Sequence, residues 1–319
     1  MSIVTEEVFY RSGDGKCAAD LYRLNTMIAT GGRRPAIVIG HGFNMVKEAL
    51  VDAAQAFVKA GYIVLAIDYR RFGRSPGQPR NLLKPLDEVE DYRNGISYLQ
   101  DRLDVDPERI GIWGVSFSGG IVLHTAAIDR RVRCVVAQSP ANLDGRQSTA
   151  DLYGAEAFAR LLDKLQQDHI RRALTGEGER VPCVAPIEKD VFPVLPGDGL
   201  LTGFIVQAAK ILASYRIDIP LESLEHMMAW APIHSVELIA PTPLLIVTNG
   251  GYDLHHRLDR IQDAFRRAGE PKRLTILPYD VVGLYAEPGL GESMRHAIAW
   301  FDQHLGAAAS AALAAARAV

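Results

Sequence analysis

Cysteine is scarce in this chain of 319 residues, and neither sign of charge is in large excess. The three cysteines, Cys17, Cys134 and Cys183, are odd in number and far apart, which excludes a disulfide framework and a cysteine-based metal cluster and fits a reducing cytoplasm. The 35 Lys and Arg residues against 38 Asp and Glu residues leave a net charge of −3. The basic surface typical of nucleic-acid-binding proteins is therefore not expected.

Long apolar runs are also missing. The longest, such as residues 61–67, have the length of a strand and fall short of the ~20 residues of a membrane span. The first seven residues, MSIVTEE, have neither the basic nor the apolar part of a signal peptide. The sequence contains no phosphate-binding Walker loop, no dinucleotide-binding glycine pattern and no metal-ligand spacing. We therefore expect a cytoplasmic protein that acts on a small molecule without cofactor, metal, nucleic acid or membrane, with a homodimer left open.

What the chain does contain is an alternation of strand-like and helix-like segments. Strands are expected at residues 36–39, 62–67, 110–115, 132–138, 243–248 and 273–277, and helices at 46–60, 86–102, 119–128, 258–268 and 292–305. The strands are almost continuously apolar, which is typical of a parallel sheet that is covered by helices on both faces. The pattern predicts an α/β fold.

The alternation stops between residues 142 and 240. This stretch contains helical pieces around a segment rich in Pro and Gly, residues 175–199. We expect a core made of residues 1–141 and 241–306, an inserted cap of residues 142–240, and an Ala-rich C-terminal tail of residues 307–319.

A serine lies between the expected strand 110–115 and the helix after it. The sequence Gly114-Val115-Ser116-Phe117-Ser118-Gly119-Gly120 has small residues two positions before and two positions after Ser116. A tight strand-to-helix turn needs such small residues because its backbones are pressed together, and it exposes the serine hydroxyl at the edge of the sheet. Ser116 is therefore the candidate nucleophile.

A second motif, His41-Gly42-Phe43, follows the first long apolar strand. A loop at this place can direct a backbone N–H group at the oxyanion that develops during acyl transfer. We expect the two donors to be the N–H groups of Phe43 and Phe117, with His41 shaping the loop.

These motifs resemble the α/β-hydrolase superfamily, and within it the dienelactone-hydrolase-like and fungal polyketide-transferase-like proteins. The matching stretches are His41–Glu48, Ile67–Arg80, Asp91–Asn94, Asp106–Gly120, Ser223–Glu225 and Pro241–Val247. The resemblance implies an eight-stranded, mostly parallel sheet with a helical cap between the sixth and seventh strands. It also implies a triad whose acid follows the seventh strand and whose histidine follows the last strand.

An acid is available at the first of these places. Asp253 follows the expected strand 243–248 and falls at the position that the resemblance implies for the acid. Asp144, after the sixth strand, is the alternative because some members place the acid there.

The histidine is missing from its usual place. Counted from Leu277-Pro278, its position is occupied by Val281, and no histidine lies between His256 and His296. Valine cannot accept a proton, and a serine without a base is a poor nucleophile at neutral pH. This predicts weak turnover of simple activated esters unless another base is present.

Three functions remain open. In the first, a hydrolase or acyl transferase acts on a small organic ester, thioester or activated ketone, with His255 or His256 as a relocated base. In the second, a lyase, isomerase, cyclase or decarboxylase uses the oxyanion hole, with Tyr279 or Asp280 moving protons. In the third, the protein is an inactive binder. The residues expected to line the pocket are His41, Met227, Trp230, Tyr279, Asp280 and Val281.

Overall fold

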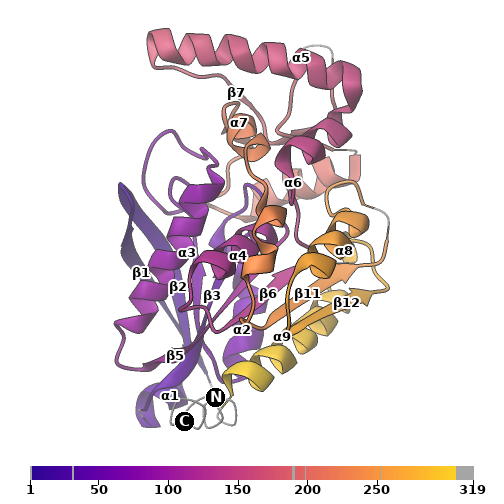
Figure 1. Cartoon of the computed structure of the whole chain (residues 1–319). Coiled ribbons are helices and arrows are strands. Elements are labelled where there is room, and N and C mark those ends of the chain that lie inside the picture. Colours follow the sequence, from indigo (N-terminus) through magenta and orange to yellow (C-terminus); the bar gives the residue numbers. More distant parts are fainter. Residues whose placement is uncertain (1, 31, 189–190, 198, 252, 307–319) are drawn as a thin grey trace.

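The computed structural model describes residues 2–30, 32–188, 191–197, 199–251 and 253–306, and its centre is an eight-stranded sheet (Figure 1). The strands of this sheet are β1 (Ile3–Ser12), β2 (Gly15–Leu24), β3 (Arg34–Gly40), β4 (Ile63–Ile67), β5 (Val105–Val115), β6 (Cys134–Gln138), β11 (Leu244–Asn249) and β12 (Lys272–Leu277). They are arranged in the order β1-β2-β4-β3-β5-β6-β11-β12. The first two pairs in this order are antiparallel and all later pairs are parallel. The expected eight-stranded, mostly parallel sheet is confirmed.

Helices cover both faces of the sheet. Those around it are α1 (Asn25–Thr30), α2 (Val51–Lys59), α3 (Pro85–Gln100), α4 (Phe117–Ile128), α8 (Leu258–Arg267) and α9 (Gly289–Leu305). On one face, side chains of α3, α4 and α8 such as Ile96, Ile121 and Ile261 belong to one buried apolar cluster. On the other face, Phe57 of α2 and Phe301 of α9 belong to a second cluster. The central strands contribute to both clusters, which explains their continuously apolar sequences.

The chain between β6 and β11 lies at one end of the sheet, in the upper part of Figure 1. Its elements are α5 (Gly145–Thr175), β7 (Arg180–Pro182), β8 (Val184–Ala185), β9 (Leu195–Pro196), α6 (Gly199–Ile211), β10 (Asp218–Pro220) and α7 (Ser223–Met228), followed by the 3-10 turns η2 (Pro232–His234) and η3 (Val236–Leu238). Two further 3-10 turns, η1 (Lys47–Leu50) and η4 (Val282–Leu284), precede α2 and α9. This insertion begins after the carboxyl end of β6 and ends before the amino end of β11.

Some elements differ from their expected bounds. The hairpin of β1 and β2 was not evident in the sequence pattern because β1 is an edge strand whose residues are mostly exposed. Helix α5 is longer than expected, and it bends at Gly154, where φ is 72°. The expected tail, residues 307–319, lies outside the described residues.

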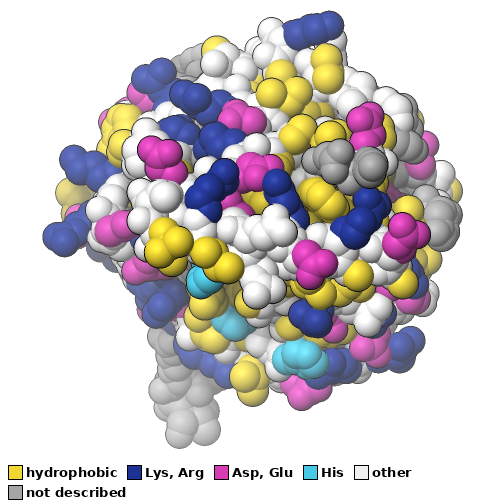
Figure 2. All heavy atoms as spheres, turned by 90° about the horizontal axis from the view of Figure 1, so that it is seen from above, with side chains coloured by type: hydrophobic (Ala, Val, Ile, Leu, Met, Phe, Trp, Pro, Cys, Tyr) yellow, Lys and Arg dark blue, Asp and Glu magenta, His cyan; other side chains and the backbone are white. Residues whose placement is uncertain are grey.

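The surface on the side of the insertion carries interspersed acidic and basic side chains with apolar patches between them (Figure 2). No single sign of charge dominates the coloured part of this face. None of the described helices combines the length and the apolar character that a membrane span needs.

A substitution at Gly114 tests the tight packing at the end of β5. A Cβ atom at this position would lie 2.3 Å from the carbonyl oxygen of Ser118, which is backbone and cannot give way easily. We expect Gly114→Ala to lower the free energy of unfolding by about 2–3 kcal/mol, as other cases of overpacking do. The measurement is the midpoint of chemical unfolding.

Gly203→Ala is the matched control, because Gly203 lies on α6 with no atom within 4 Å of a built Cβ. This change should leave stability unchanged or raise it by up to about 1 kcal/mol. Equal destabilisation by both substitutions would contradict the expectation.

Candidate active site

Ser116 lies on the turn between β5 and α4, and its backbone is strained. Its φ of 57° and ψ of −120° are unusual for a residue with a side chain. Hydrogen bonds hold the turn: the Ser116 N–H donates to the carbonyl of Gln138 at 2.8 Å, and the Ser116 carbonyl accepts from the N–H groups of Gly119 at 2.8 Å and Ala141 at 3.0 Å. The neighbouring β6 and the segment after it therefore fix the serine in place.

The residue two positions after Ser116 is Ser118, where the motif often has glycine. Its side chain is fully buried, and its hydroxyl hydrogen-bonds to Tyr69 at 2.6 Å and Tyr92 at 2.8 Å. The larger side chain is accommodated because two buried phenols of the core satisfy its polar group.

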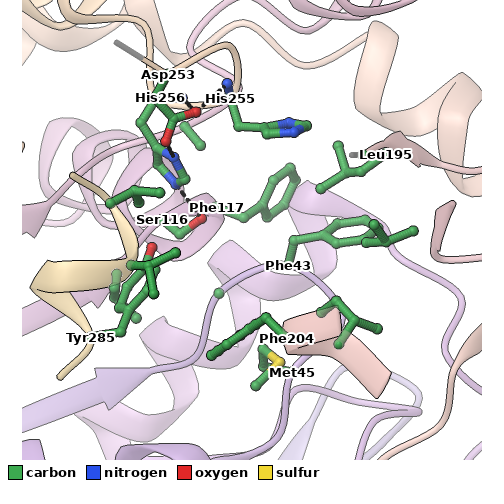
Figure 3. Close-up of a pocket in the computed structure, with 18 of the residues that line it drawn as sticks. Phe43, Met45, Ser116, Phe117, Leu195, Phe204, Asp253, His255, His256 and Tyr285 are labelled. Carbon is green, nitrogen blue, oxygen red and sulfur yellow. Dashed lines mark hydrogen bonds and ion pairs between the residues drawn. The ribbon is translucent and has the colours of Figure 1, made fainter. Parts of the chain in front are cut away.

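The hydroxyl of Ser116 contacts His256. The distance from Ser116 Oγ to His256 Nε2 is 2.8 Å, and His256 Nδ1 lies 2.9 Å from Oδ2 of Asp253 (Figure 3). His256 is only 7% exposed, so bulk water competes little for its ring nitrogens. Serine, imidazole and carboxylate thus form a continuous chain of hydrogen bonds, which is the arrangement of a catalytic triad.

Acid and imidazole come from one short loop after β11. The second oxygen of Asp253, Oδ1, accepts the backbone N–H groups of His255 at 2.7 Å and His256 at 3.2 Å. Burial alone raises the pKa of Asp253, but the hydrogen bonds from His256 and from the two N–H groups outweigh it and hold that pKa well below its usual range. The carboxylate is therefore ionised at neutral pH and keeps the proton of His256 on Nδ1.

The other candidates for acid and base lie elsewhere. The ring of His255 turns away from Ser116 toward Leu195 (Figure 3). Asp144 caps the start of α5, where its side chain accepts the N–H of Gln147 at 3.2 Å. The structure therefore brings Asp253 and His256 to Ser116, and neither His255 nor Asp144 joins them.

The loop after β3 passes close to Ser116. A Cβ atom at Gly42 would lie 3.1 Å from the Cβ of Ser116, so only glycine allows this approach without displacement. Phe43 follows on this loop, and Phe117 is the first residue of α4, where N–H groups have no acceptor within the helix. The two rings pack edge to face with centroids 6.4 Å apart. Their roles as oxyanion donors stay a prediction that this geometry allows.

Ser116 faces a cavity of about 850 Å³. The insertion contributes Leu152, Pro186, Ile187, Leu195, Phe204, Ile205 and Met227, and the core contributes Phe43, Met45, Leu50, Trp113, Phe117, Val281, Tyr285 and Leu290. Among the described lining residues there is no Lys or Arg, and the acidic ones are Asp52, Asp253 and Asp280. In the part of the chain that the structure describes, no group of His, Cys, Asp and Glu side chains is arranged to hold a metal ion.

Two of the residues expected to line the pocket, Trp230 and Tyr279, are not among the described residues that line the cavity. Trp230 is buried, its ring packs on His124 at 4.9 Å between centroids, and its Nε1 lies near Gly120 of α4. Tyr279 points to α9 and donates its hydroxyl to Glu292 at 2.8 Å. Both side chains pack between elements, which a loop position in the sequence does not reveal.

The remaining expected residues, His41, Met227, Asp280 and Val281, do line the cavity. Val281 thus lies in the site at the place where a histidine was expected, without a polar group of its own.

Tyr285 is a site residue that was not anticipated. It lies just after η4 and lines the cavity, and its hydroxyl points toward Ser116 (Figure 3). A signal for it was absent because it stands in a loop whose sequence departs from the expected pattern. The spacing Asp253-x-x-His256, by contrast, could have favoured His256 over His255, since an Asp that caps a turn faces the residue three positions later.

The chain is similar to several known proteins. A family model described as serine aminopeptidase S33 matches residues 31–189. The quorum-quenching protein AidA of Acinetobacter baumannii is 39% identical over 181 residues, or 56% of this chain, and the match spans 58% of that relative. A thiohydrolase of Eupenicillium brefeldianum is 30% identical over 243 residues, which cover 75% of this chain and 76% of the relative.

A solved structure has the same fold over almost its whole length. The α/β hydrolase GrgF from Penicillium superposes with a TM-score of 0.78, covering 95% of this chain and 99% of that one at 23% identity. A Penicillium sequence named polyketide transferase grgF is 28% identical over 258 residues, which cover 77% of this chain and 80% of the relative.

The pH dependence of stability tests the environment of His41. Its ring is fully buried beside the carbonyl of Gly42, and burial lowers its pKa to about 4. The unfolded chain takes up a proton below its ordinary pKa of about 6.5, whereas the folded protein does so only near pH 4. Acidification from pH 7 to pH 4 should therefore reduce the free energy of unfolding through this group by about 3 kcal/mol.

His41→Asn is the comparison, with unfolding free energies measured from pH 7 to pH 4. The difference in the free energy of unfolding between the parent protein and the variant should shrink by about 3 kcal/mol from pH 7 to pH 4. Asp68 Oδ1 lies 4.0 Å from His41 Nε2, and burial raises the pKa of this carboxyl to about 6, so the two proteins are also compared in an Asp68→Asn background to remove its contribution. Parallel curves would mean that His41 titrates normally in the folded protein.

Proposed function

The chain belongs to the α/β-hydrolase superfamily, alongside thiohydrolases and polyketide transferases, and from this membership we propose that it is a serine hydrolase or acyl transferase with Ser116 as nucleophile, His256 as base and Asp253 as acid. The observation that carries the proposal is the pair of hydrogen bonds from Ser116 Oγ to His256 Nε2 and from His256 Nδ1 to Asp253. Sequence similarity and fold support hydrolysis or acyl transfer as the class of reaction.

The geometry supports the following first half-reaction. His256 Nε2 takes the proton of Ser116 while Oγ attacks the carbonyl carbon of the substrate. The N–H groups of Phe43 and Phe117 stabilise the resulting oxyanion. His256 then gives its proton to the departing alcohol or thiol, and the acyl group stays on Ser116. Asp253 stabilises the transient imidazolium because it remains charged throughout.

The relocated base changes the expectation of weak turnover. Non-hydrolytic chemistry and an inactive binder were considered because a histidine was missing after the last strand. His256 Nε2 lies 2.8 Å from Ser116 Oγ, so a base is available, and the reason for considering those two alternatives no longer applies. For this reason we propose no second function.

The lining of the cavity favours a neutral, apolar acyl group. Most of the lining side chains are aliphatic or aromatic, and its charged side chains are acidic. An anionic acyl group would meet repulsion without a compensating cation. The names of two relatives make thioesters the first class to test, beside oxygen esters.

Labelling by a fluorophosphonate tests the triad, because the probe reacts with activated serines. Ser116→Ala should abolish labelling, and His256→Ala should slow it by roughly 10²–10⁴-fold, which is the usual contribution of a general base. His255→Ala is the matched control on the same loop and should label like the parent protein. Val281→His should bring no gain, since the base is already present.

The opposite pattern would reject the assignment. If His256→Ala labels at the parent rate, His256 is not the base. If Val281→His accelerates labelling by orders of magnitude, the native loop after β11 does not supply a working base.

Ester length tests the cavity. With p-nitrophenyl esters, kcat/KM should be at least about tenfold higher for octanoate than for acetate, because each buried methylene contributes up to about 0.8 kcal/mol. The monoester of succinic acid, a short anionic acyl group, should be a poorer substrate than the butyrate. A preference for acetate, or for succinate over butyrate, would contradict the proposed apolar acyl site.

A further inference from the structure

The loop after β3 carries a buried asparagine, Asn44, directly after Phe43. Asn44 is 1% exposed, and its φ of 51° lies in the left-handed region that residues with a side chain rarely adopt. It is not among the described residues that line the cavity. A buried polar side chain on a strained backbone, next to the expected oxyanion donor, therefore needs an explanation other than contact with the substrate.

The amide of Asn44 has three partners. Its Nδ2 donates to the carbonyl of Arg216 at 2.9 Å and lies 3.3 Å from the hydroxyl of Tyr215. Its Oδ1 accepts from Nδ2 of Asn81 at 2.6 Å. These partners fix the orientation of the amide, because a backbone carbonyl can only accept and must face the NH₂ group. Both polar atoms of the buried amide are thus satisfied.

The partners come from two other parts of the chain. Tyr215 and Arg216 belong to the insertion, between α6 and β10, whereas Asn81 lies in the loop between β4 and α3. Tyr215 and Asn81 are themselves buried, and the hydroxyl of Tyr215 lies 3.3 Å from Sγ of Cys183, also in the insertion. Asn44 therefore joins the loop after β3 to the insertion and to a second loop of the core.

The same loop contacts the nucleophile on its other side. A Cβ atom at Gly42 would lie 3.1 Å from the Cβ of Ser116, and the N–H of Met45 donates to the carbonyl of Gly42 at 3.1 Å. This hydrogen bond closes a four-residue turn with Phe43 and Asn44 at its centre. Phe43 and Ser116 both line the cavity (Figure 3). A shift of Asn44 would move the peptide planes of this turn, one of which carries the N–H of Phe43.

We propose that Asn44 is a positioning residue for the oxyanion hole, whose amide holds the turn of residues 42–45 so that the N–H of Phe43 points at the substrate oxygen. The inference rests on the proposed function, because an oxyanion forms only if Ser116 attacks a carbonyl carbon. Asn44 acts through Phe43 and not by contact with the substrate. Negative charge develops on the substrate oxygen during the attack, so a well-placed donor stabilises the transition state more than the bound substrate.

Asn44→Gly is the test, because glycine adopts a φ of 51° without strain and removes the amide. With p-nitrophenyl octanoate, kcat should fall roughly 10–100-fold, less than the ~10²–10³-fold loss for a deleted oxyanion donor, because the N–H of Phe43 is displaced and not removed. KM should stay within about threefold of the parent value, since binding of the ground state is unaffected. The pH dependence of kcat/KM should not move, because His256 and Asp253 are unchanged.

Inhibition by octyl trifluoromethyl ketone gives an independent readout. Ser116 Oγ adds to the ketone carbon while His256 takes the serine proton, and the former carbonyl oxygen becomes an oxyanion. In Asn44→Gly the inhibition constant should rise by about the same factor as kcat/KM falls, because this adduct resembles the transition state. A loss of stability alone would lower the melting temperature without this parallel change.

Tyr153→Phe is the matched control for the loss of a buried hydrogen bond of the insertion. Tyr153 is buried outside the cavity lining, and its hydroxyl donates to the carbonyl of Pro193, so this contact stays within the insertion. The variant should be less stable but should keep the parent values of kcat, KM and the inhibition constant. An equal fall of kcat in this control would overturn the inference, because the effect would then come from a weakened insertion.

Asn81→Gly tests the amide from the core side and covers the case in which Asn44→Gly does not fold, as judged by its thermal unfolding. The φ of Asn81 is 59°, so glycine again fits the backbone. Loss of the hydrogen bond to Asn44 Oδ1 should lower kcat about 3–10-fold with KM unchanged, the range for one hydrogen bond. The double variant should be no slower than Asn44→Gly, because both changes act through one amide. An unchanged kcat in Asn81→Gly, or losses that multiply in the double variant, would reject the proposal.

The remaining failures can be told apart. If the parent protein neither reacts with a fluorophosphonate nor turns over esters, the proposed function fails, and the inference fails with it. If the parent is active but Asn44→Gly keeps its kcat, the inference alone is overturned. It is also overturned if the loss appears in KM or as a shifted pH dependence, because the amide would then act on substrate binding or on the triad.

Discussion

The tight turn at Ser116 is the constraint on which the rest of the site depends. A side chain at a φ of 57° is held there only because neighbouring backbones approach closely and bind the turn by hydrogen bonds. Gly42, Gly114 and Gly119 each lie where a Cβ atom would meet the turn or the segment beside it. The sheet edge, the loop after β3 and the start of α4 are thus organised around one strained residue.

Asp253 and His256, the proposed acid and base, lie on a single loop after β11. Asp253 uses one oxygen to fix the backbone of the turn and the other to orient the ring of His256. With His256 as the proposed base, the loop after β12 does not need to supply one. In this chain it brings Val281 to the cavity wall and points the hydroxyl of Tyr285 toward Ser116.

The insertion between β6 and β11 gives this chemistry its surroundings. Phe204 and Leu195 come from the insertion, whereas Phe43 and Leu290 come from the core, and together they make most of the cavity wall apolar. In such an environment the hydrogen bonds along the triad are stronger than in water. Under the proposed function, the same lining selects the acyl groups that can reach the serine.

The sequence by itself determined the alternation of strands and helices and the tight turn at Ser116, and it offered Asp253 as the first of two candidates for the acid. These depend on local periodicity and on small residues at fixed spacing, which act over a few positions of the chain. Only the tertiary structure decided that His256 and not His255 faces Ser116, that Trp230 and Tyr279 pack away from the cavity, and that Tyr285 enters it. The reason is that the direction of a side chain in a loop depends on the path of that loop and on what it packs against, and neither is encoded in the spacing of a few residues.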